Sequence, residues 1–422
     1  MSACPVDAPC GLVEAPTEPG PICAATRLNR LSLWPQTPPA LGAADAVFPQ
    51  VAVAPVFVSE ADRQRMALGV QALHQALTSR AWADSVCPQA PAVAQHDPGN
   101  SGVLYGFDFH LTPQGPKLIE INTNAGGALI SVQLMKQQRR CCSAMSDPAV
   151  DAAAAERRIL ASFLSEWQAT RPTEKPRTIA IVDADPDTQY LREEFRLFAA
   201  LFRDAGIEAV ICDPRALEGG AGGLRHEGRP IDLVYNRLTD FYLEAPALAS
   251  LREAWLSDAV VLTPHPRAHA LFADKRHLAR LGDPLLLSAL GLAPEAQAAI
   301  LDVVLPTRVV RREDAEVLWR ERRQLYFKPA GAFGGRGAYE GAKLTRSTFE
   351  RLLEQDYVAQ AFVPAPKRQV LVGAEAVELK FDVRCFVYRG EVQLLAARLY
   401  RGQATNFRTP GGGFATVHVV PG

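Results

Sequence analysis

Helical and strand periodicities alternate along the chain, and the first clear one predicts a helix. Ser59, Glu60 and Asp62 are typical of a helix start. Apolar residues then recur at helical spacing on one face: Met66, Val70, Leu73 and Leu77. A helix is therefore expected from about Ser59 to Ser79. The preceding residues, 1–58, are rich in Pro, Ala and Gly without clear periodicity and predict an irregular segment.

The next periodic stretch predicts two strands that carry polar side chains. One strand contains Asp108, the other contains Glu120 and Asn122, and the turn Pro113–Pro116 joins them. Side chains alternate along a strand, so Glu120 and Asn122 point to the same face. A carboxylate beside an amide oxygen suits a hard cation that keeps some waters, which predicts a magnesium site here. The alternative is an exposed polar strand edge, but the apolar neighbours of Glu120 favour the site, because buried acids need partners.

Beyond the linker Arg171–Pro176 the pattern changes to alternating strands and helices, which is typical of a small parallel α/β unit. A helix is predicted before the linker, over about residues 147–170. Four strands and one helix are expected after it: Thr178–Val182, the helix Thr188–Arg203, Ala209–Cys212, Leu233–Tyr235 and Val260–Leu262. No GxGxxG follows the first strand, which argues against dinucleotide binding. Ligands in such sheets bind beyond strand carboxyl ends, so Asn236 and Arg237 are candidate substrate contacts.

A glycine-rich loop follows a predicted strand that ends at Lys328. Its glycines let the backbone bend tightly and approach phosphate without interference from a Cβ: Gly331, Gly334, Gly335 and Gly337. A strand resumes after the last glycine, so the loop is expected as a hairpin tip. It differs from a Walker A loop, which opens a helix. The alternative is a surface hairpin without a ligand.

A row of charged residues marks one predicted strand face near the end of the chain. Lys380, Asp382 and Arg384 share this face, and Arg398 and Asn406 follow on or beyond the next strand. Such cations would stabilise charge on a transferring phosphoryl group or an acyl phosphate. The alternative is a salt-bridged strand pair, for example between Asp382 and Arg398.

Length and charge narrow the class of protein. A chain of 422 residues exceeds what one hydrophobic core supports, so two or three packed units are expected. The formal net charge of -1 gives no electrostatic reason to expect a nucleic-acid or anionic-membrane partner. The first residues lack a secretory signal, and no apolar stretch could cross a bilayer without burying charge. A cytoplasmic location is therefore expected.

Cysteine and histidine spacing does not predict a transition-metal site. The eight cysteines include no CxxC pair, and the adjacent Cys141 and Cys142 are expected as free thiols in a reduced compartment. His265 and His269 have the spacing of a helical metal pair, but Pro266 lies between them. A loop without metal ligation is expected there.

Together these elements resemble the ATP-grasp superfamily over residues 100–135 and 177–420. Nine residues carry the resemblance: Asp108, Glu120, Asn122, Lys275, Lys328, Asp382, Arg384, Arg398 and Asn406. In most ATP-grasp enzymes the acid and Glu-x-Asn elements come last, whereas here they come first. The chain is thus similar to a circularly permuted ATP-grasp protein, arranged like the eukaryotic-type glutathione synthetases. The fold class implied is α/β (α+β), with a small parallel α/β pre-ATP-grasp domain.

The resemblance implies ATP and Mg2+ as cofactors and a role for each matching residue. ATP would be held by two lysines, the glycine loop and a hinge strand: Lys275, Lys328, Gly331, Gly334, Gly335, Gly337, Gln360, Phe362 and Val363. Magnesium would be bound by three residues: Asp108, Glu120 and Asn122. Three residues would act in catalysis: Arg384, Arg398 and Asn406. Substrate would meet Asn236 and Arg237 and be covered by a closing loop: Gly411, Gly412 and Gly413.

The resemblance also implies a division into parts. Residues 1–58 form the irregular segment. Four parts follow: an N-terminal part of the catalytic unit at 59–172, the α/β domain at 173–270, a lid with the glycine hairpin at 271–358 and core strands at 359–422.

The implied reaction is ATP- and magnesium-dependent ligation. A carboxylate attacks the γ-phosphorus, and an amine or thiol captures the acyl phosphate. The expected partners are small-molecule carboxylate and amine or thiol substrates, with no nucleic acid or membrane, and a homodimer is left open. Two alternatives remain: an ATP-grasp kinase that phosphorylates a small molecule, and a non-catalytic nucleotide-binding protein.

Some positions depart from the family pattern. The hinge position that is usually acidic is Gln360, and the acid that would bind ribose is not evident, with Glu375 and Glu378 as candidates. Some glutathione synthetases carry an acid in the glycine loop, whereas residues 331–337 contain none. The chain is therefore not expected to be glutathione synthetase itself.

Overall fold

The structure is a computed structural model of the 422-residue chain. It describes these residues: 12–13, 32–33, 51–52, 54–141, 151–171, 175–331, 334–335, 337–372, 375–403, 405–406 and 409–420. Most of the predicted irregular segment, and the Cys141 and Cys142 side chains, lie outside what is described. Within the described residues, no helix combines the length and the apolar character that a bilayer span requires.

The centre of the molecule is a seven-stranded sheet that joins distant parts of the chain. Its order is β3-β20-β19-β18-β4-β5, and β17 pairs with β18. The strands are β3 (Val56–Ser59), β4 (Tyr105–Thr112), β5 (Gly115–Asn122), β17 (Lys367–Val372), β18 (Glu375–Tyr388), β19 (Glu391–Tyr400) and β20 (Gly413–Val420). All neighbours are antiparallel except β3 and β20, which are parallel. The early polar strands therefore lie beside the late cationic strands.

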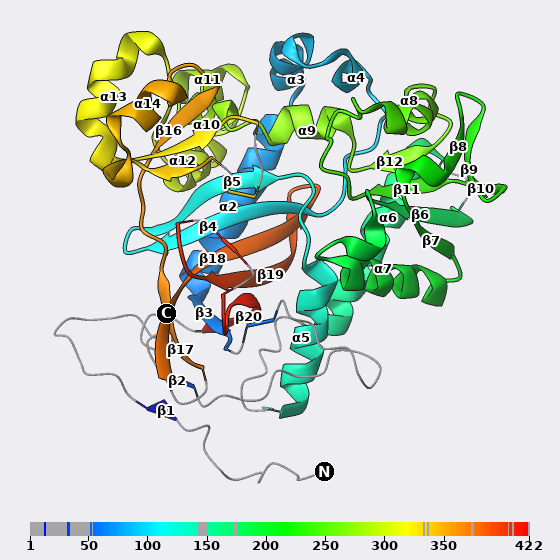
Figure 1. Cartoon of the computed structure of the whole chain (residues 1–422), viewed down its shortest axis with the longest axis horizontal. Coiled ribbons are helices and arrows are strands. Elements are labelled where there is room, and N and C mark those ends of the chain that lie inside the picture. The colour runs from blue at the N-terminus through cyan, green and yellow to red at the C-terminus, as the bar shows by residue number, and fades with distance from the viewer. Residues whose placement is uncertain are drawn as a thin grey trace.

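Helices cover both faces of this sheet (Figure 1). On one face, α2 (Glu60–Leu77) and α12 (Pro294–Val303) join the core that contains Val383 and Cys385. On the other, α5 (Ala128–Cys141) and α6 (Ala152–Thr170) join the core that contains Phe386 and Ala396. Since side chains alternate along a strand, Arg384 shares the second face with Phe386. The charged row therefore lies on the α5–α6 side, beyond the end of the apolar core.

A parallel α/β domain flanks the central sheet, on the right in Figure 1. Its sheet has the order β12-β11-β6-β7 and is fully parallel. Its elements are β6 (Thr178–Val182), α7 (Arg192–Asp204), β7 (Glu208–Cys212), β11 (Leu233–Asn236), α8 (Ala249–Leu256) and β12 (Val261–Thr263). The predicted parallel unit is confirmed. A small antiparallel sheet, which the sequence did not predict, inserts after β7: β8 (Leu217–Gly220), β9 (Gly223–His226) and β10 (Arg229–Ile231).

A second antiparallel sheet forms a lid over the opposite end of the molecule, at the upper left in Figure 1. Its order is β13-β16-β14-β15. Its elements are β13 (Thr307–Val309), α13 (Ala315–Glu321), β14 (Leu325–Pro329), β15 (Tyr339–Glu340), α14 (Arg346–Leu352) and β16 (Tyr357–Ala361). They share a core around Phe327 and Phe349. The glycine loop joins β14 to β15, which pair antiparallel, as predicted for a hairpin.

Three helices precede the lid: α10 (Arg276–Leu281), α11 (Pro284–Ala289) and α12. Their buried residues Leu281, Leu287 and Ile300 belong to the core of the central sheet, and not to that of the lid. By packing, residues up to α12 therefore belong with the central sheet, and the lid begins close to β13. The boundary expected from the sequence was residue 271.

Other local expectations are refined by the structure. The helix predicted after Ser59 is α2, and the Ser59 hydroxyl accepts a hydrogen bond from the Asp62 amide. The loop expected at His265 and His269 is wrong, because α9 (Pro266–Phe272) begins there with His265 as its N-cap. Pro266 occupies the first helical turn, where a missing N–H costs nothing. Two short helices also precede β4: α3 (Arg80–Val86) and α4 (Ala92–Gln95).

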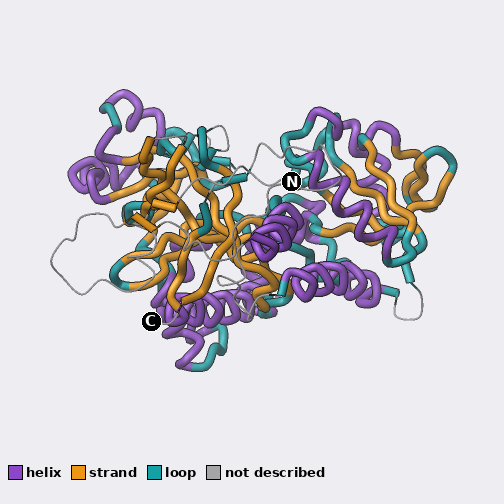
Figure 2. Tube along the Cα trace, turned by 90° about the horizontal axis from the view of Figure 1, so that it is seen from below, coloured by secondary structure: helices purple, strands orange, loops and turns teal. Residues whose placement is uncertain are grey.

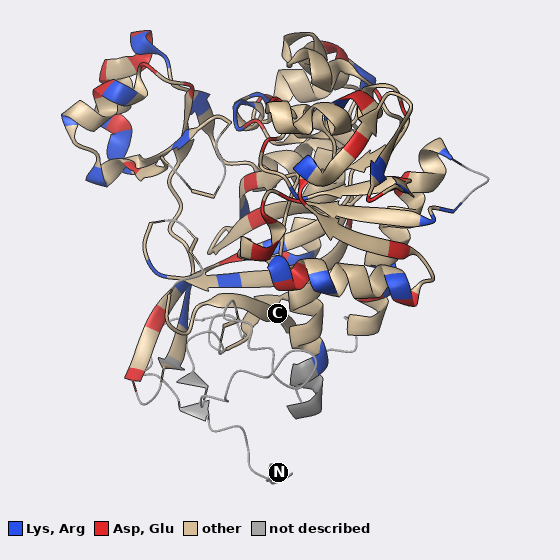
Figure 3. Cartoon of the chain, turned by 45° about the vertical axis from the view of Figure 1, so that its right-hand side comes forward, with Lys and Arg blue, Asp and Glu red and all other residues tan. Residues whose placement is uncertain are grey.

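The view from below separates the lid and central sheet from the parallel domain (Figure 2). Acidic and basic residues are interspersed over the helices of both flanking parts (Figure 3).

Candidate functional site

A β-bulge between β4 and β5 brings the acidic residues of these strands opposite each other. Asp108 on β4 lies opposite Glu120 on β5, whereas Phe109 lies opposite Leu118, so Ile119 is the extra residue. Such a bulge bends its strand and re-aims neighbouring side chains. The freed carbonyl oxygen of Ile119 accepts a hydrogen bond from Lys328 Nζ at 2.8 Å. One irregularity therefore pairs the two acids and holds a lysine of the lid.

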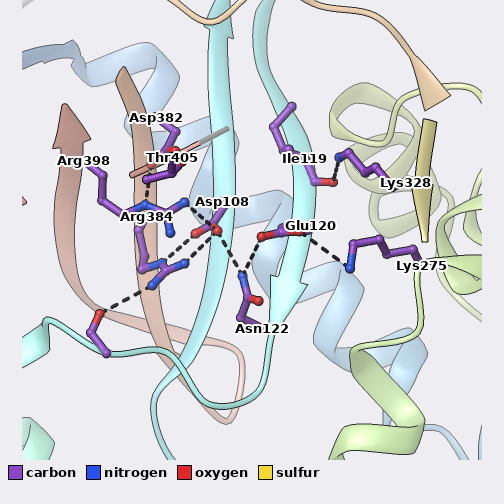
Figure 4. Close-up of polar contacts among 11 residues, drawn as sticks. Asp108, Ile119, Glu120, Asn122, Lys275, Lys328, Asp382, Arg384, Arg398 and Thr405 are labelled. Atoms are coloured by element: carbon purple, nitrogen blue, oxygen red, sulfur yellow. Dashed lines mark hydrogen bonds and ion pairs between the residues drawn. The ribbon is translucent and has the colours of Figure 1, made fainter. Parts of the chain in front are cut away.

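Two arginines converge on Asp108 (Figure 4). Arg384 donates through Nε and Nη2 to both carboxylate oxygens at 2.7 and 2.8 Å. Arg398 donates through Nη2 to Asp108 at 2.8 Å and through Nε to Asp382 at 2.7 Å. Burial opposes the charge of Arg398, but both carboxylates hold its pKa above the ordinary value. The predicted Asp382–Arg398 salt bridge is present, and it forms part of the cluster instead of replacing it.

Asp108 is held by three side chains, which bears on its predicted role as a metal ligand. Besides both arginines, Asn122 Nδ2 donates to it at 3.0 Å. Its side chain is 2% exposed. This environment suits a carboxylate that orients two guanidinium groups. Its assignment to magnesium stays a prediction.

Glu120 is ionised and accessible. Its side chain is 22% exposed, and its Oε2 lies 3.7 Å from Lys275 Nζ. Burial would raise its pKa, but the positive charges of Lys275 and Lys328 outweigh that effect and lower it to about 2. Asn122 Nδ2 donates to the other oxygen at 3.2 Å, which turns the amide oxygen away from both acids. The Asn122 amide thus presents its nitrogen, and not its oxygen, to the two acids.

Lys328 is buried at the junction of the lid and the central sheet. Besides Ile119, its Nζ donates to Gln360 Oε1 at 2.8 Å. Burial lowers its pKa to about 8, although the Glu120 carboxylate favours the charged form. Lys275, which the structure places just before α10, points at Glu120 from the other side (Figure 4).

A cavity of about 380 Å³ opens between the lid sheet and the central sheet. It contains most of the predicted nucleotide residues, including Lys275, Lys328, Gly334, Gly335, Gln360, Phe362 and Val363, together with Asp108, Glu120, Asp382 and Arg398. The structure therefore brings together the acidic strands, the cationic strands and the glycine hairpin, although they are far apart in the sequence.

Some backbone groups of the predicted hinge strand, residues 360–363, already form hydrogen bonds within the protein. The amides of Ala361 and Phe362 donate to Pro306 and Gln324 carbonyls at 2.7 and 2.8 Å. The Val363 carbonyl lies 3.2 Å from His110 Nδ1. Gln360 contributes differently: its Oε1 is taken by Lys328, and its buried Nε2 has no partner within the described residues. A ligand acceptor in the cavity would satisfy this donor.

The glycine hairpin has the backbone conformation that its sequence predicts. Gly334, Gly335 and Gly337 have φ values of 65, 68 and 69°. Side chains other than glycine rarely adopt this region. At Gly337 a Cβ would also lie 2.9 Å from the Tyr357 hydroxyl oxygen, which donates to the Gly337 carbonyl.

A second cavity, about 170 Å³ in volume, adjoins the first. Both are lined by Glu120, Lys275, Gly334 and Arg398. The second is otherwise lined by Asn122, Arg384, Gly331 and a group of residues that the sequence did not assign to a site: Ile121, Thr123, Asn124, Ala125, Thr239, Phe241, His269 and Ala273. Phe241 and His269 come from the loop after β11 and from α9, so only the tertiary structure joins them.

Several predicted residues do not line either cavity. Asn406 is exposed, and its amide donates to the Arg401 carbonyl and accepts from Thr409 at 2.9 Å, so it fixes its own loop. Gly411 to Gly413 lead into β20. Gly412 packs so tightly that a Cβ would lie 2.6 Å from the Leu399 carbonyl oxygen. Their catalytic and substrate roles stay predictions.

The two candidate residues of the α/β domain are buried. Asn236 Nδ2 donates to the Pro264 carbonyl at 3.2 Å, and its Oδ1 accepts from the Leu238 amide. Arg237 donates to Asn124 Oδ1 and to the Tyr235 hydroxyl. Arg237 therefore supports Asn124, which lines the second cavity. Of the ribose candidates, Glu378 does not line the first cavity, but it pairs with Lys367, which does.

These groups fit a magnesium nucleotide. Lys275, Lys328 and the glycine backbone provide cations and donors for phosphates, and the unsatisfied Gln360 donor provides a place for an acceptor. Within the described residues no group of three His, Cys, Asp or Glu side chains could hold a metal by itself. Glu120 and Asn122 suffice for Mg2+, which is usually bound through one or two protein oxygens plus phosphates and water.

Comparisons with known proteins support the fold. No family model and no curated protein matches the chain. A glutathione synthetase-like effector from Globodera pallida, solved in the apo form, is similar with a TM-score of 0.58 at 13% identity, over 88% of this chain and 90% of that chain. A putative gamma-glutamylcysteine synthetase from Methylobacillus flagellatus KT gives a TM-score of 0.48 at 12% identity, over 85% and 88%. The ATP-grasp ligase PsnB, complexed with minimal precursor, Mg and ADP, gives 0.28 at 15% identity, over 57% and 88%.

The chain therefore has an ATP-grasp-type fold of the mixed α/β class. At such low identity the similarity concerns the fold alone.

Proposed function

We propose that the protein is an ATP- and magnesium-dependent ligase that joins a carboxylate to an amine or thiol through an acyl phosphate. One observation carries the proposal: Arg398 lines both cavities and is held by Asp108 and Asp382. A guanidinium fixed at such a junction can bind a phosphoryl group arriving from one side and a carboxylate arriving from the other.

In this proposal each group of residues has a role that follows from its position. Lys275 and Lys328 hold the polyphosphate, and Gln360 Nε2 donates to an acceptor of the nucleotide. Glu120 and the Asn122 amide oxygen would hold Mg2+, which neutralises phosphate charge and polarises the γ-phosphate. Arg384 and Arg398 orient the substrate carboxylate and stabilise the negative charge that develops on the oxygens of the acyl phosphate.

The order of these elements along the chain belongs to the same proposal. Asp108 and Glu120 precede the lid, while Arg384 and Arg398 follow it, and β4 pairs with β18. A circular permutation of the ATP-grasp order accounts for this arrangement, since joining the chain after Phe414 to Ser101 restores the usual order.

The test is a screen of paired acids and amines or thiols for ADP release that requires both partners and Mg2+. The product is then identified by mass spectrometry. A ligase releases ADP and phosphate and yields an amide or thioester. ADP release with phosphate retained on a single substrate would identify a kinase instead, and nucleotide binding without ADP release would identify a non-catalytic protein.

A further inference from the structure

The second cavity has a junction end and a far wall that differ in charge. Lys275 and Arg398 lie at the junction end, where the cavity meets the first, together with Glu120. Arg384 lines the second cavity and binds Asp108 beside Arg398. The far wall is formed by residues after β5 and β11 and by α9, and none of its described side chains is acidic: Thr123, Asn124, Ala125, Thr239, Phe241, His269 and Ala273. A bound molecule therefore meets cations at one end and uncharged groups at the other.

The nearby carboxylates are already paired with cations. Asp108 accepts from Arg384 and Arg398, and Asp382 accepts from Arg398. Glu120, the one acid among the described lining residues, faces Lys275. An ammonium group on a substrate would find no unpaired carboxylate here and would lie near three cations. Taking it from water into this cavity would be unfavourable.

The far wall is uncharged and partly aromatic. Phe241 and His269 stack with ring centroids 3.9 Å apart and planes 9° apart. Burial, assisted by the charge of Lys275, lowers the pKa of His269 to about 3, so the imidazole is neutral at physiological pH. Its Nδ1 lies 3.0 Å from the Thr123 hydroxyl. These rings offer an apolar surface to the body of a ligand.

The Asn124 amide on this wall is already hydrogen-bonded. Asn124 Nδ2 donates to the Leu238 carbonyl at 2.9 Å, and its Oδ1 accepts from Arg237. Its amide is therefore committed to holding the wall together and does not require a charged ligand partner.

Resting on the ligase function proposed above, we propose that the second cavity is the acid subsite and that it selects carboxylic acids with an uncharged, apolar body. The carboxylate binds Arg384 and Arg398, and the body packs against Phe241 and His269. Acids that carry an α-ammonium group are rejected because no carboxylate is free to pair with it.

Two probes that differ only in the ammonium group test this selectivity. Binding of 3-phenylpropanoate and of L-phenylalanine to the full chain, with Mg2+ and a non-hydrolysable ATP analogue, is measured by calorimetry. We expect 3-phenylpropanoate to bind at least about tenfold more tightly, which corresponds to about 1.4 kcal/mol. Equal affinities, tighter binding of L-phenylalanine, or no binding of either probe would overturn the proposal.

A charge swap on the far wall provides the matched control. Thr239 is exposed at the rim of the cavity, so its substitution should not disturb the core. Thr239→Asp is expected to reduce the ratio of the affinities for 3-phenylpropanoate and L-phenylalanine at least threefold. Thr239→Asn introduces a side chain of the same shape as aspartate but without its charge, and is expected to keep the wild-type ratio. Phe241→Ala should weaken 3-phenylpropanoate binding by about two- to tenfold, the usual range for an aromatic contact. Identical preferences in both Thr239 variants would contradict the model.

Binding and turnover separate this proposal from the ligase function. If 3-phenylpropanoate binds selectively but no acid supports ADP release, the subsite stands and the ligase function fails. If only acids that carry an ammonium group support ADP release, the ligase function stands and this subsite assignment fails.

Discussion

Glu120 is the residue on which the proposed magnesium site depends most directly. It remains ionised throughout the physiological range because its pKa is about 2, and it lies beside the Asn122 amide. Glu120→Gln, nearly isosteric but uncharged, should reduce Mg2+-dependent ADP release by at least about 100-fold, as for other groups that stabilise transition-state charge. An unchanged circular dichroism spectrum would show that folding is intact. Normal ADP production by the folded variant would rule out the site.

Lys328 makes nucleotide binding depend on pH. Its pKa of about 8 means that the free protein loses this charge as the pH rises above 8, whereas bound phosphates favour the charged form. Nucleotide affinity should therefore fall by up to about tenfold per pH unit above 8, with uptake of a proton on binding. Calorimetry in buffers of different ionisation enthalpy measures this uptake. Lys328→Arg, which stays charged, should bind without proton uptake at pH 9; uptake equal to that of the wild type would exclude Lys328 as its source.

The same group affects stability with the opposite sign. The folded-state pKa lies below the ordinary value of 10.5, so between about pH 8 and 10.5 the unfolded chain holds a proton that the folded chain has lost. The contribution of Lys328 to the free energy of unfolding therefore rises with pH in this window, by up to about 1.4 kcal/mol per unit, and its burial is fully unfavourable below pH 8.

Residue types could be predicted from the sequence more readily than residue roles. Glu120, Lys275, Lys328 and Arg398 do line one cavity. Lys275 was expected there from the family resemblance, and the other three were expected from the chemistry that a magnesium nucleotide requires. Asp108 has the expected location, but its partners could not be read from spacing, since both arginines come from strands far away in the sequence. The stacking of Phe241 on His269 gave no sequence signal, and the spacing of His269 from His265 had suggested only a metal pair.

At the scale of elements, the β14–β15 hairpin depends on Gly337 more than on Gly334. Both have positive φ, so alanine at either costs about 1 kcal/mol from backbone conformation. Only at Gly337 would a Cβ meet Tyr357 and Pro329, at 2.9 and 3.1 Å. Gly337→Ala should therefore destabilise the lid by about 2–3 kcal/mol and Gly334→Ala by about 1 kcal/mol. Hydrogen exchange of the β14 and β16 amides measures both, and equal protection in the two variants would contradict this account.

Helices and strands could be predicted from the periodicity of the sequence, whereas irregularities such as β-bulges could not. α2 and the parallel strands of the α/β domain are near their expected bounds because each has a clear helical or strand pattern. The bulge at Ile119 was not predicted, because a single extra residue leaves alternation almost unchanged. It nevertheless decides where Glu120 points and where Lys328 docks.

At the scale of the whole molecule, Glu166 links the parallel domain to the central sheet. It is fully buried on α6 and accepts hydrogen bonds from five groups: Asn100 Nδ2, the amides of Ser101 and Gly102, Thr263 Oγ1 and Tyr388 Oη. Glu166→Gln would place an amide donor against other donors and should lower the free energy of unfolding by about 3 kcal/mol.

The matched control lies on the same helix. Glu156 pairs with Lys136 at 2.7 Å in a partly exposed position, so Glu156→Gln should cost less than about 1 kcal/mol. Urea midpoints of both variants measure the difference. Equal midpoints would mean that Glu166 does not hold the parts together.

The pairing of β3 with β20 constrains how the protein is made. Val56–Ser59 can pair only after Val417–Val420 has been synthesised, and Asp108 meets Arg384 and Arg398 equally late. The parallel domain needs only neighbouring residues, so it can fold while translation continues. The central sheet has to wait, with its early strands exposed, until Val420 has left the ribosome. Assembly of the central sheet therefore follows the synthesis of β20, and slow translation of β18 to β20 prolongs the period in which a nascent chain is vulnerable to aggregation.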